Sequence, residues 1–162
     1  MTSEPLPEAT RNTLRASDWR IGVWRAFLRA HAGALRELER ELMAETGTPL
    51  GWYDVLLQLA EAPGRRLRMA ELADKVLLSR SGLTRVIDRL QTAGLVRREP
   101  SPDDARGTFT VLTPDGIARL RAAAPTHLAG IRKYWLAHFS DDELRELGRL
   151  LDRVAPSQQI SR

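Results

Sequence analysis

The sequence predicts a mainly α-helical fold with about six helices and one small β-hairpin, and three kinds of observation support it. Apolar residues recur at helical spacing through most of residues 18–154. Capping residues stand where several of these segments begin and end. Two short extended runs, LVRRE (95–99) and TFTVL (108–112), flank a turn that contains proline, aspartate and glycine, as expected for a hairpin.

A long helix is predicted from Asp18 to Thr46 by two rows of residues at heptad spacing, which is typical of a helix that packs against other helices. Gly47 and Pro49 end it, and Gly47 suits the left-handed cap conformation. Residues 1–17 hold two prolines and few bulky apolar groups, so we expect them to form a flexible arm. The rows consist of Ile21, Leu28, Leu35 and Leu42, and of Trp24, His31 and Leu38.

Shorter elements are predicted in the middle of the chain. A helix over 50–61 is followed by RRLR (65–68), which is short enough to be a small strand. A short helix over 69–76 then precedes a longer one, which Ser79 caps and Gly94 ends.

Two further helices are predicted after the hairpin. Thr113-Pro114-Asp115 begins the first, with a capping threonine, a proline at the first helical position and an acid in the first turn. Pro125 is expected to bend or break this helix, because proline removes a backbone hydrogen bond. Ser140 and Glu143 form a capping box that begins the last helix. Its apolar face carries Leu144, Leu147, Leu151 and Val154.

This order of elements predicts a winged helix-turn-helix over residues 50–112, flanked by long helices at 18–46 and 114–154. Residues 18–154 would form a single unit, followed by a tail at 155–162. The chain has no cysteine, which excludes disulfides, thiolate metal sites and iron–sulfur clusters. Its three histidines lack the HxxxH and HExxH spacings, so we expect neither a metal nor a cofactor.

Charge and hydropathy narrow the class of partner. The longest stretch without a charged residue, 122–131, is far shorter than the ~20 residues of a membrane helix. No signal peptide opens the chain, so we expect a cytoplasmic, nucleoid-associated protein without membrane contact. Residues 64–106 carry ten basic and six acidic side chains, a net +4, while the remainder sums to zero. Such a basic segment suits DNA, although an ordinary arginine-rich surface would look similar.

The helix from Ser79 to Ala93 is the candidate DNA-reading element. At 100° per residue, Leu83, Ile87 and Leu90 face the core. Hydroxyl and guanidinium groups near the N-terminus of an exposed helix face suit the major groove of DNA. The alternative is an ordinary amphipathic surface helix. The exposed side carries Ser81, Thr84, Arg85, Asp88 and Thr92, with Arg80 at its flank.

The run ELADKVLLSRSGLTRVIDRLQTAGLVRREPSPDDARGTFTVLTPDG resembles the MarR family of bacterial transcription regulators. In that family ELA opens the first helix of the motif, SxxxLTRxxDRLxxxGLV is the recognition helix and DxRG lies at the tip of the wing. The resemblance covers roughly residues 18–154. It implies a homodimer, held by the first and last helices, that binds a pseudo-palindromic operator as a regulator, most often a repressor.

The resemblance also implies roles for individual residues. Asp104 and Arg106 match the wing pair, in which the arginine enters the minor groove and the aspartate holds it. Ala105 replaces a common basic residue, and Arg68 replaces a common helix-capping hydroxyl. We expect Arg98 to contact DNA of any sequence. The complete set of expected DNA-binding residues is Arg68, Ser79, Arg80, Ser81, Thr84, Arg85, Arg98, Asp104 and Arg106.

Members of this family commonly bind small aromatic or phenolic anions, so the resemblance also implies an effector. Aromatic side chains with an imidazole and a carboxylate are the local chemistry that permits such a site. The alternative is that these aromatic residues pack in the core or in a dimer interface. The candidate ligand-binding residues are Trp19, Trp24, His31, Tyr53 and Asp54.

Two other classes of function are compatible with a helical chain of this kind. An enzyme would need a convergent catalytic set, but Asp141, Asp142 and Glu143 are better explained as helix-capping charge. The serines near residue 80 have no histidine within the same motif, so we expect no catalytic activity. The stronger alternative is a helical dimeric module that binds a ligand or protein without reading DNA.

Overall fold

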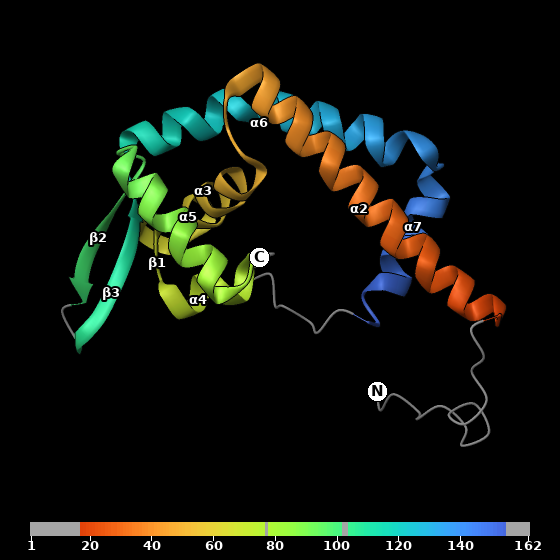
Figure 1. The fold of residues 1–162 in the computed structure, drawn as a ribbon, viewed down its shortest axis with the longest axis horizontal. Coiled ribbons are helices and arrows are strands. Elements are labelled where there is room, and N and C mark those ends of the chain that lie inside the picture. The colour runs from red at the N-terminus through yellow and green to blue at the C-terminus, as the bar shows by residue number, and fades with distance from the viewer. Residues whose placement is uncertain (1–16, 77, 102–103, 155–162) are drawn as a thin grey trace. The chain divides into compact units, whose positions relative to one another are not determined.

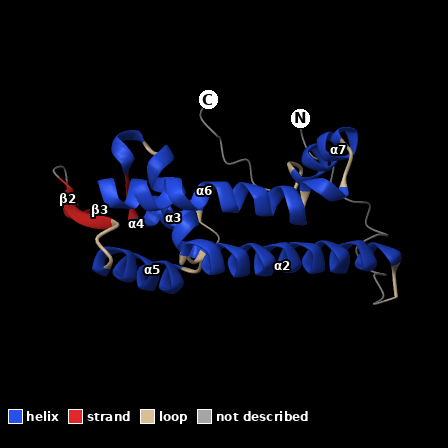
Figure 2. Ribbon diagram, turned by 90° about the horizontal axis from the view of Figure 1, so that it is seen from above, coloured by secondary structure: helices blue, strands red, loops and turns tan. Residues whose placement is uncertain are grey.

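The computed structural model describes residues 17–76, 78–101 and 104–154, and only the backbone at 101 and 104–107. Most of the predicted arm (1–17) and the whole tail (155–162) lie outside these residues. The helices are α2 (Trp19–Thr46), α3 (Leu50–Glu61), α4 (Met69–Lys75), α5 (Arg80–Thr92), α6 (Pro114–Tyr134) and α7 (Asp141–Leu151). The strands β1 (Arg66–Arg68), β2 (Val96–Ser101) and β3 (Asp104–Leu112) form one antiparallel sheet in the order β1-β3-β2 (Figures 1 and 2).

The long first helix is confirmed, and its two halves differ in burial. The chain divides within α2, between Arg36 and Glu37. Most side chains of the first half are exposed, whereas Leu38 and Leu42 of the second half are buried. Gly47 ends the helix at φ +62°, the left-handed conformation expected of it.

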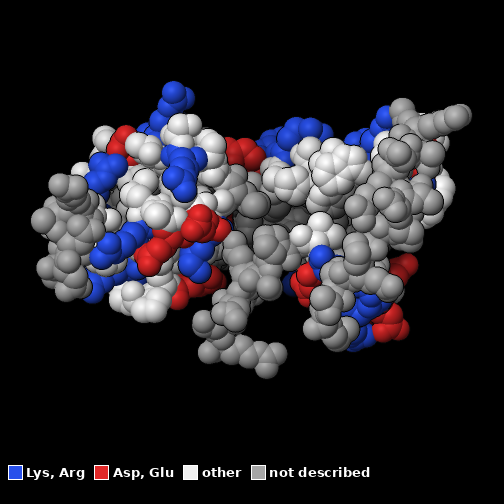
Figure 3. Space-filling model, turned by 90° about the horizontal axis from the view of Figure 1, so that it is seen from below, with Lys and Arg blue, Asp and Glu red and all other residues white. Residues whose placement is uncertain are grey.

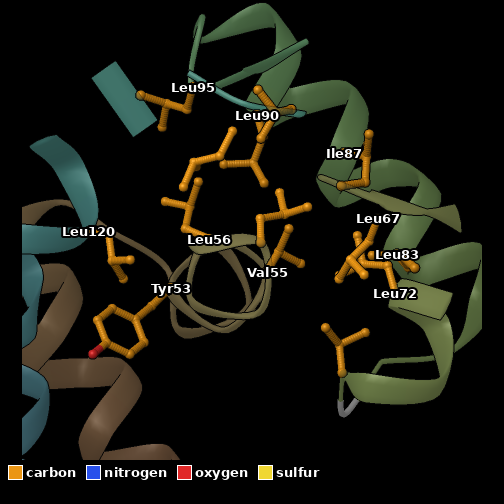
Figure 4. Close-up of a cluster of buried hydrophobic side chains, with 14 of the residues drawn as sticks. Tyr53, Val55, Leu56, Leu67, Leu72, Leu83, Ile87, Leu90, Leu95 and Leu120 are labelled. Atoms are coloured by element: carbon orange, nitrogen blue, oxygen red, sulfur yellow. The ribbon is translucent and has the colours of Figure 1, made fainter. Parts of the chain in front are cut away.

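The core of the second part is built around α3. Val55, Leu56 and Leu59 are fully buried and point toward side chains from α4, α5 and the sheet. Figure 4 shows Leu56 and Val55 facing leucines of α5 and of the segment that follows it. The apolar face of α3 therefore forms the centre of this core. Each neighbouring helix or strand buries its own apolar residues against that face.

The sheet has an inner face against the helices and an outer face. Leu67 of β1 pairs in register with Thr110 of β3, and both are buried. On the outer face, the guanidinium carbons of Arg66 and Arg68 lie 4.9 and 5.2 Å from the centroid of the Phe109 ring. The arginine stems thus cover an aromatic ring on the outer face of the sheet.

The predicted caps are confirmed, and α6 continues through its proline. Ser140 and Glu143 form the expected capping box at the start of α7. Pro125 was expected to bend or break α6, and it does not break it, because the helix is continuous from Pro114 to Tyr134. Ala123 before the proline is buried in the core, and Gly130 after it is buried against Leu38 of α2; these contacts offset one lost hydrogen bond. The last helix also ends earlier than expected, at Leu151.

Candidate DNA interface

The two faces of α5 differ as its spacing predicts. Leu83, Ile87 and Leu90 are buried to 1% exposure or less, and they join the core around α3. The expected groove-facing residues of α5 are all exposed: Arg80, Ser81, Thr84, Arg85, Asp88 and Thr92. The burial of one face fixes which side chains the helix can offer to a partner.

The N-terminus of α5 carries a compact set of hydroxyl groups. The Ser79 hydroxyl accepts a hydrogen bond from the Gly82 backbone N–H at 3.1 Å, so it is the helix cap. The Thr84 hydroxyl donates to the carbonyl of Arg80 at 3.1 Å, which fixes its rotamer. Arg80 and Arg85 form no ion pair with a carboxylate among the residues that the structure describes. Their guanidinium groups are therefore available to an anionic partner.

A pairing that the sequence did not reveal joins α5 to the wing. Arg98 of β2 places its Nη2 2.6 Å from the Oδ1 of Asp88. Together with Gln91 and Thr92, these two residues line a shallow polar hollow of about 330 Å³ between the helix and the strand. The sequence offered one indication of this ion pair: Asp88 lies on the exposed face of a predicted helix, and Arg98 follows ten residues later in the next predicted strand.

The remaining expected DNA contacts are described less completely. Asp104 and Arg106 lie in the first part of β3, where the structure describes no side chains. Arg68 is at the start of α4, where its backbone N–H donates to Oε2 of Glu71 at 2.7 Å. Glu71 thus supplies a cap bond at a position where a capping hydroxyl is absent. The Arg68 guanidinium lies over Phe109, on the outer face of the sheet rather than beside α5.

The basic surface is interrupted by acids. Figure 3 shows lysine and arginine side chains spread over the winged part of the molecule, with aspartate and glutamate between them. Arg97 on β2 is held by Glu99 at 2.8 Å, so it too is paired. The positive charge available to a partner is therefore concentrated at fewer positions than the composition suggests.

The candidate effector residues fall into two groups, each described on its own. On α2 the Trp24 and Phe27 rings stack with centroids 5.8 Å apart, and Phe27 and His31 follow at 6.1 Å. All three are exposed, as is Trp19 at 75%. This row of rings runs along one face of the helix.

Tyr53 on α3 lies in a different environment. Its ring is buried and packs against His127 of α6, with centroids 4.1 Å apart. The Nδ1 atom of His127 is buried with no hydrogen-bond partner in the described structure, and burial lowers the pKa of this imidazole below its usual range. Burial also raises the pKa of the Tyr53 hydroxyl. The sequence did not single out His127 as the neighbour of Tyr53.

The described residues contain neither a membrane-spanning helix nor a group of side chains suited to a metal ion. No helix there has the length and apolar character needed to cross a bilayer. No group of three or more histidine, aspartate or glutamate side chains there is arranged to hold a metal ion.

The capped helix α5, the helices beneath it and the three-stranded sheet define a winged helix-turn-helix protein. A sequence model of the MarR family matches residues 46–107. The crystal structure of Sco3205, a MarR family transcriptional regulator from Streptomyces coelicolor in complex with DNA, is 36% identical. It aligns over 99% of this chain and 95% of that one with a TM-score of 0.81. The chain belongs to the MarR family.

Other relatives agree with this assignment. AbsC, another MarR family regulator of Streptomyces coelicolor, is 33% identical, with 88% of this chain and 95% of that one covered and a TM-score of 0.80. The transcriptional repressor YetL of Bacillus subtilis is 30% identical over 69% of each chain. The regulator MhqR of the same organism is 34% identical over 53% of this chain, and the match spans 59% of its own length. The predicted fold class and family are confirmed.

Proposed function

We propose that the chain is a DNA-binding transcriptional regulator, acting as a repressor, that binds a pseudo-palindromic operator as a homodimer at the nucleoid. The observation that carries this proposal is the exposed face of α5, where Ser81, Thr84 and Arg85 stand beside one another opposite a fully buried apolar face. Membership of a family of transcriptional regulators supports it, as does the DNA-bound state of Sco3205. No catalytic role is proposed.

In this proposal α5 enters the major groove of DNA. Arg80 and Arg85 present donors that match the two acceptors on the edge of guanine, and Ser81 and Thr84 reach bases or phosphates. Ser79 acts through the cap that holds the first turn. Backbone N–H groups at the start of the helix attract a phosphate. The wing pair, Asp104 and Arg106, would read the width of the minor groove.

The proposed dimer would cover apolar surface that each chain leaves exposed. On the first half of α2, Leu28 of the expected heptad rows is exposed, and so is Val23. None of the residues of α7 is buried, although one face is rich in leucine. A symmetric pair of chains would present its two α5 helices about 34–36 Å apart, one turn of DNA.

Replacing Arg85 by alanine is expected to weaken binding to the operator by roughly tenfold to a hundredfold, because one base-reading arginine contributes about 1–3 kcal/mol of discrimination. Binding to random DNA should fall much less. The measurement is a binding titration on an operator selected from random duplexes and on a scrambled duplex of equal length. Arg145→Ala on α7 is the control and should leave both affinities unchanged. An equal loss on both duplexes would show that Arg85 does not read bases.

Selection of bound sites from random duplexes also distinguishes the proposed regulator from the main alternative. A helical module that binds a protein or ligand without reading DNA would enrich no sequence, whereas a dimeric regulator would enrich two half-sites with fixed spacing.

We further propose that a small aromatic anion releases the protein from DNA, which the exposed row Trp24, Phe27 and His31 supports. Adding benzoate or 4-hydroxybenzoate is expected to quench tryptophan fluorescence and to lower operator affinity over the same concentration range. In Trp24→Phe the fluorescence change should shrink while operator binding without ligand stays normal. A flat titration across aromatic carboxylates and purines would contradict this part of the proposal.

A further inference from the structure

An acidic side chain stands on the face of α5 that the proposed function turns toward DNA. Asp88 is exposed there, one turn beyond Thr84 and Arg85. A carboxylate at this position repels phosphates, so its presence on a DNA-facing surface needs a physical reason. The structure supplies one, because the carboxylate does not stand alone.

Asp88 is held by an arginine of the wing. The register of β2 places Arg98 opposite Thr110, on the face of the sheet that meets the helices, while Arg97 and Glu99 point to the outer face and pair with each other. From the inner face, the guanidinium of Arg98 reaches Asp88 at 2.6 Å. The Thr92 hydroxyl donates to the carbonyl of Asp88 at 2.9 Å, at the edge of the same hollow.

The ion pair contributes little to folding. The side chains of Arg98 and Asp88 are 37% and 54% exposed, and exposed pairs of this kind stabilise proteins weakly or not at all. Its effect on DNA binding is larger. An arginine that already pairs with a carboxylate gains little from a phosphate, since the new contact must replace the old one.

We propose that Asp88 is a positioning residue for sequence-selective binding: it fixes Arg98 at the junction of recognition helix and wing and keeps it from binding phosphates of any sequence. This inference rests on the proposed function. The ion pair would hold the wing at one orientation to α5. The wing and α5 would then reach neighbouring grooves together only on a duplex with the operator sequence. It also changes the expectation for Arg98, whose loss should lower selectivity rather than weaken all DNA binding alike.

The test is Asp88→Asn in the full chain, with affinities measured for the selected operator and a scrambled duplex over a range of salt concentrations. We expect binding to scrambled DNA to rise several-fold and to depend more steeply on salt, by about one unit of logarithmic slope, because Arg98 is freed to meet a phosphate. The ratio of operator to scrambled affinity should fall by about tenfold, the size of one lost discriminating contact. Thermal unfolding should change little.

Further variants distinguish the positioning of Arg98 by Asp88 from a general effect of the Asp88 charge on DNA. Asp88→Glu keeps the carboxylate and should retain most of the ratio. In the double variant Asp88→Asn, Arg98→Gln, the gain on scrambled DNA should vanish, because that gain acts through Arg98. Asp142→Asn is the control: it makes the same change at an exposed carboxylate that pairs with an arginine on α7, and it should change neither affinity.

Each other outcome overturns the inference. An unchanged ratio in Asp88→Asn, an equal change on both duplexes, or a gain that persists without Arg98 would show that Asp88 does not act by holding Arg98. These results would leave the proposed function intact as long as the unaltered chain selects an operator. If the unaltered chain binds all duplexes equally, the proposed function and this inference both fail.

Discussion

A Leu151→Glu variant is expected to be monomeric and to bind the operator at least about a hundredfold more weakly than the unaltered chain. In the single chain Leu151 is 37% exposed, Val154 is more exposed still, and nothing on α7 is buried. An amphipathic helix with an uncovered leucine face is stabilised when a partner covers that face. A carboxylate on that face would have to be buried in the proposed dimer without a partner, which is strongly unfavourable.

The loss of DNA affinity follows from the loss of the second half-site. Two linked DNA-binding domains bind far more tightly than one, by factors of about 10²–10⁴. Sedimentation of the purified variant reports its oligomeric state, and titration of the operator reports its affinity. Arg145→Gln is the control, since it lowers the charge by the same single unit on the polar face of the same helix. A variant that remains dimeric, or a monomer with full operator affinity, would contradict the proposed assembly.

Gly116→Ala is expected to destabilise the chain by about 3 kcal/mol, at the upper end of the range for overpacked sites, and to lower its melting temperature by roughly 10 °C. A Cβ at this position would lie 2.1 Å from the carbonyl oxygen of Leu95 and 2.6 Å from a methyl group of Leu112. The Leu95 oxygen is backbone, and it already accepts the Thr113 N–H at 3.2 Å. The first turn of α6 must therefore move away from the sheet.

This crowding arises where the wing ends and α6 begins. Thr113 holds the junction: its hydroxyl accepts the Gly116 N–H at 3.1 Å and donates to the carbonyl of Gly94 at 2.7 Å. Thermal and chemical unfolding of both proteins would measure the effect. Gly22→Ala is the control, because no atom of the described residues lies within 4 Å of the added methyl group, and it should raise stability by up to about 1 kcal/mol. Unchanged stability in Gly116→Ala would mean that α6 packs less tightly than the structure shows.

Local chemistry in the sequence was sufficient to predict most of the elements and the exposed face of α5. Ser79, Thr113 and Ser140 cap the helices that follow them, as expected. These features depend on residues three or four positions apart, whose relation the helix geometry itself fixes. At Pro125 the same rule predicted either a bend or a break, and the helix continues through the proline.

The partners of individual side chains required the folded chain. Nothing in the spacing of Tyr53 and His127, on two helices far apart in sequence, indicated that their rings meet. The same is true of Gly116, which reads in the sequence as an ordinary residue of a capped first turn.

By itself the sequence determined the class of fold, the family and the side of α5 that faces outward, since periodicity and capping act within a single element. Only the tertiary structure decided that Arg98 is held by Asp88, that Tyr53 packs on His127 and that Gly116 lies against a backbone oxygen. Such contacts depend on strand register and on how helices approach one another. Both are set by the packing of the whole core rather than by neighbours in the chain.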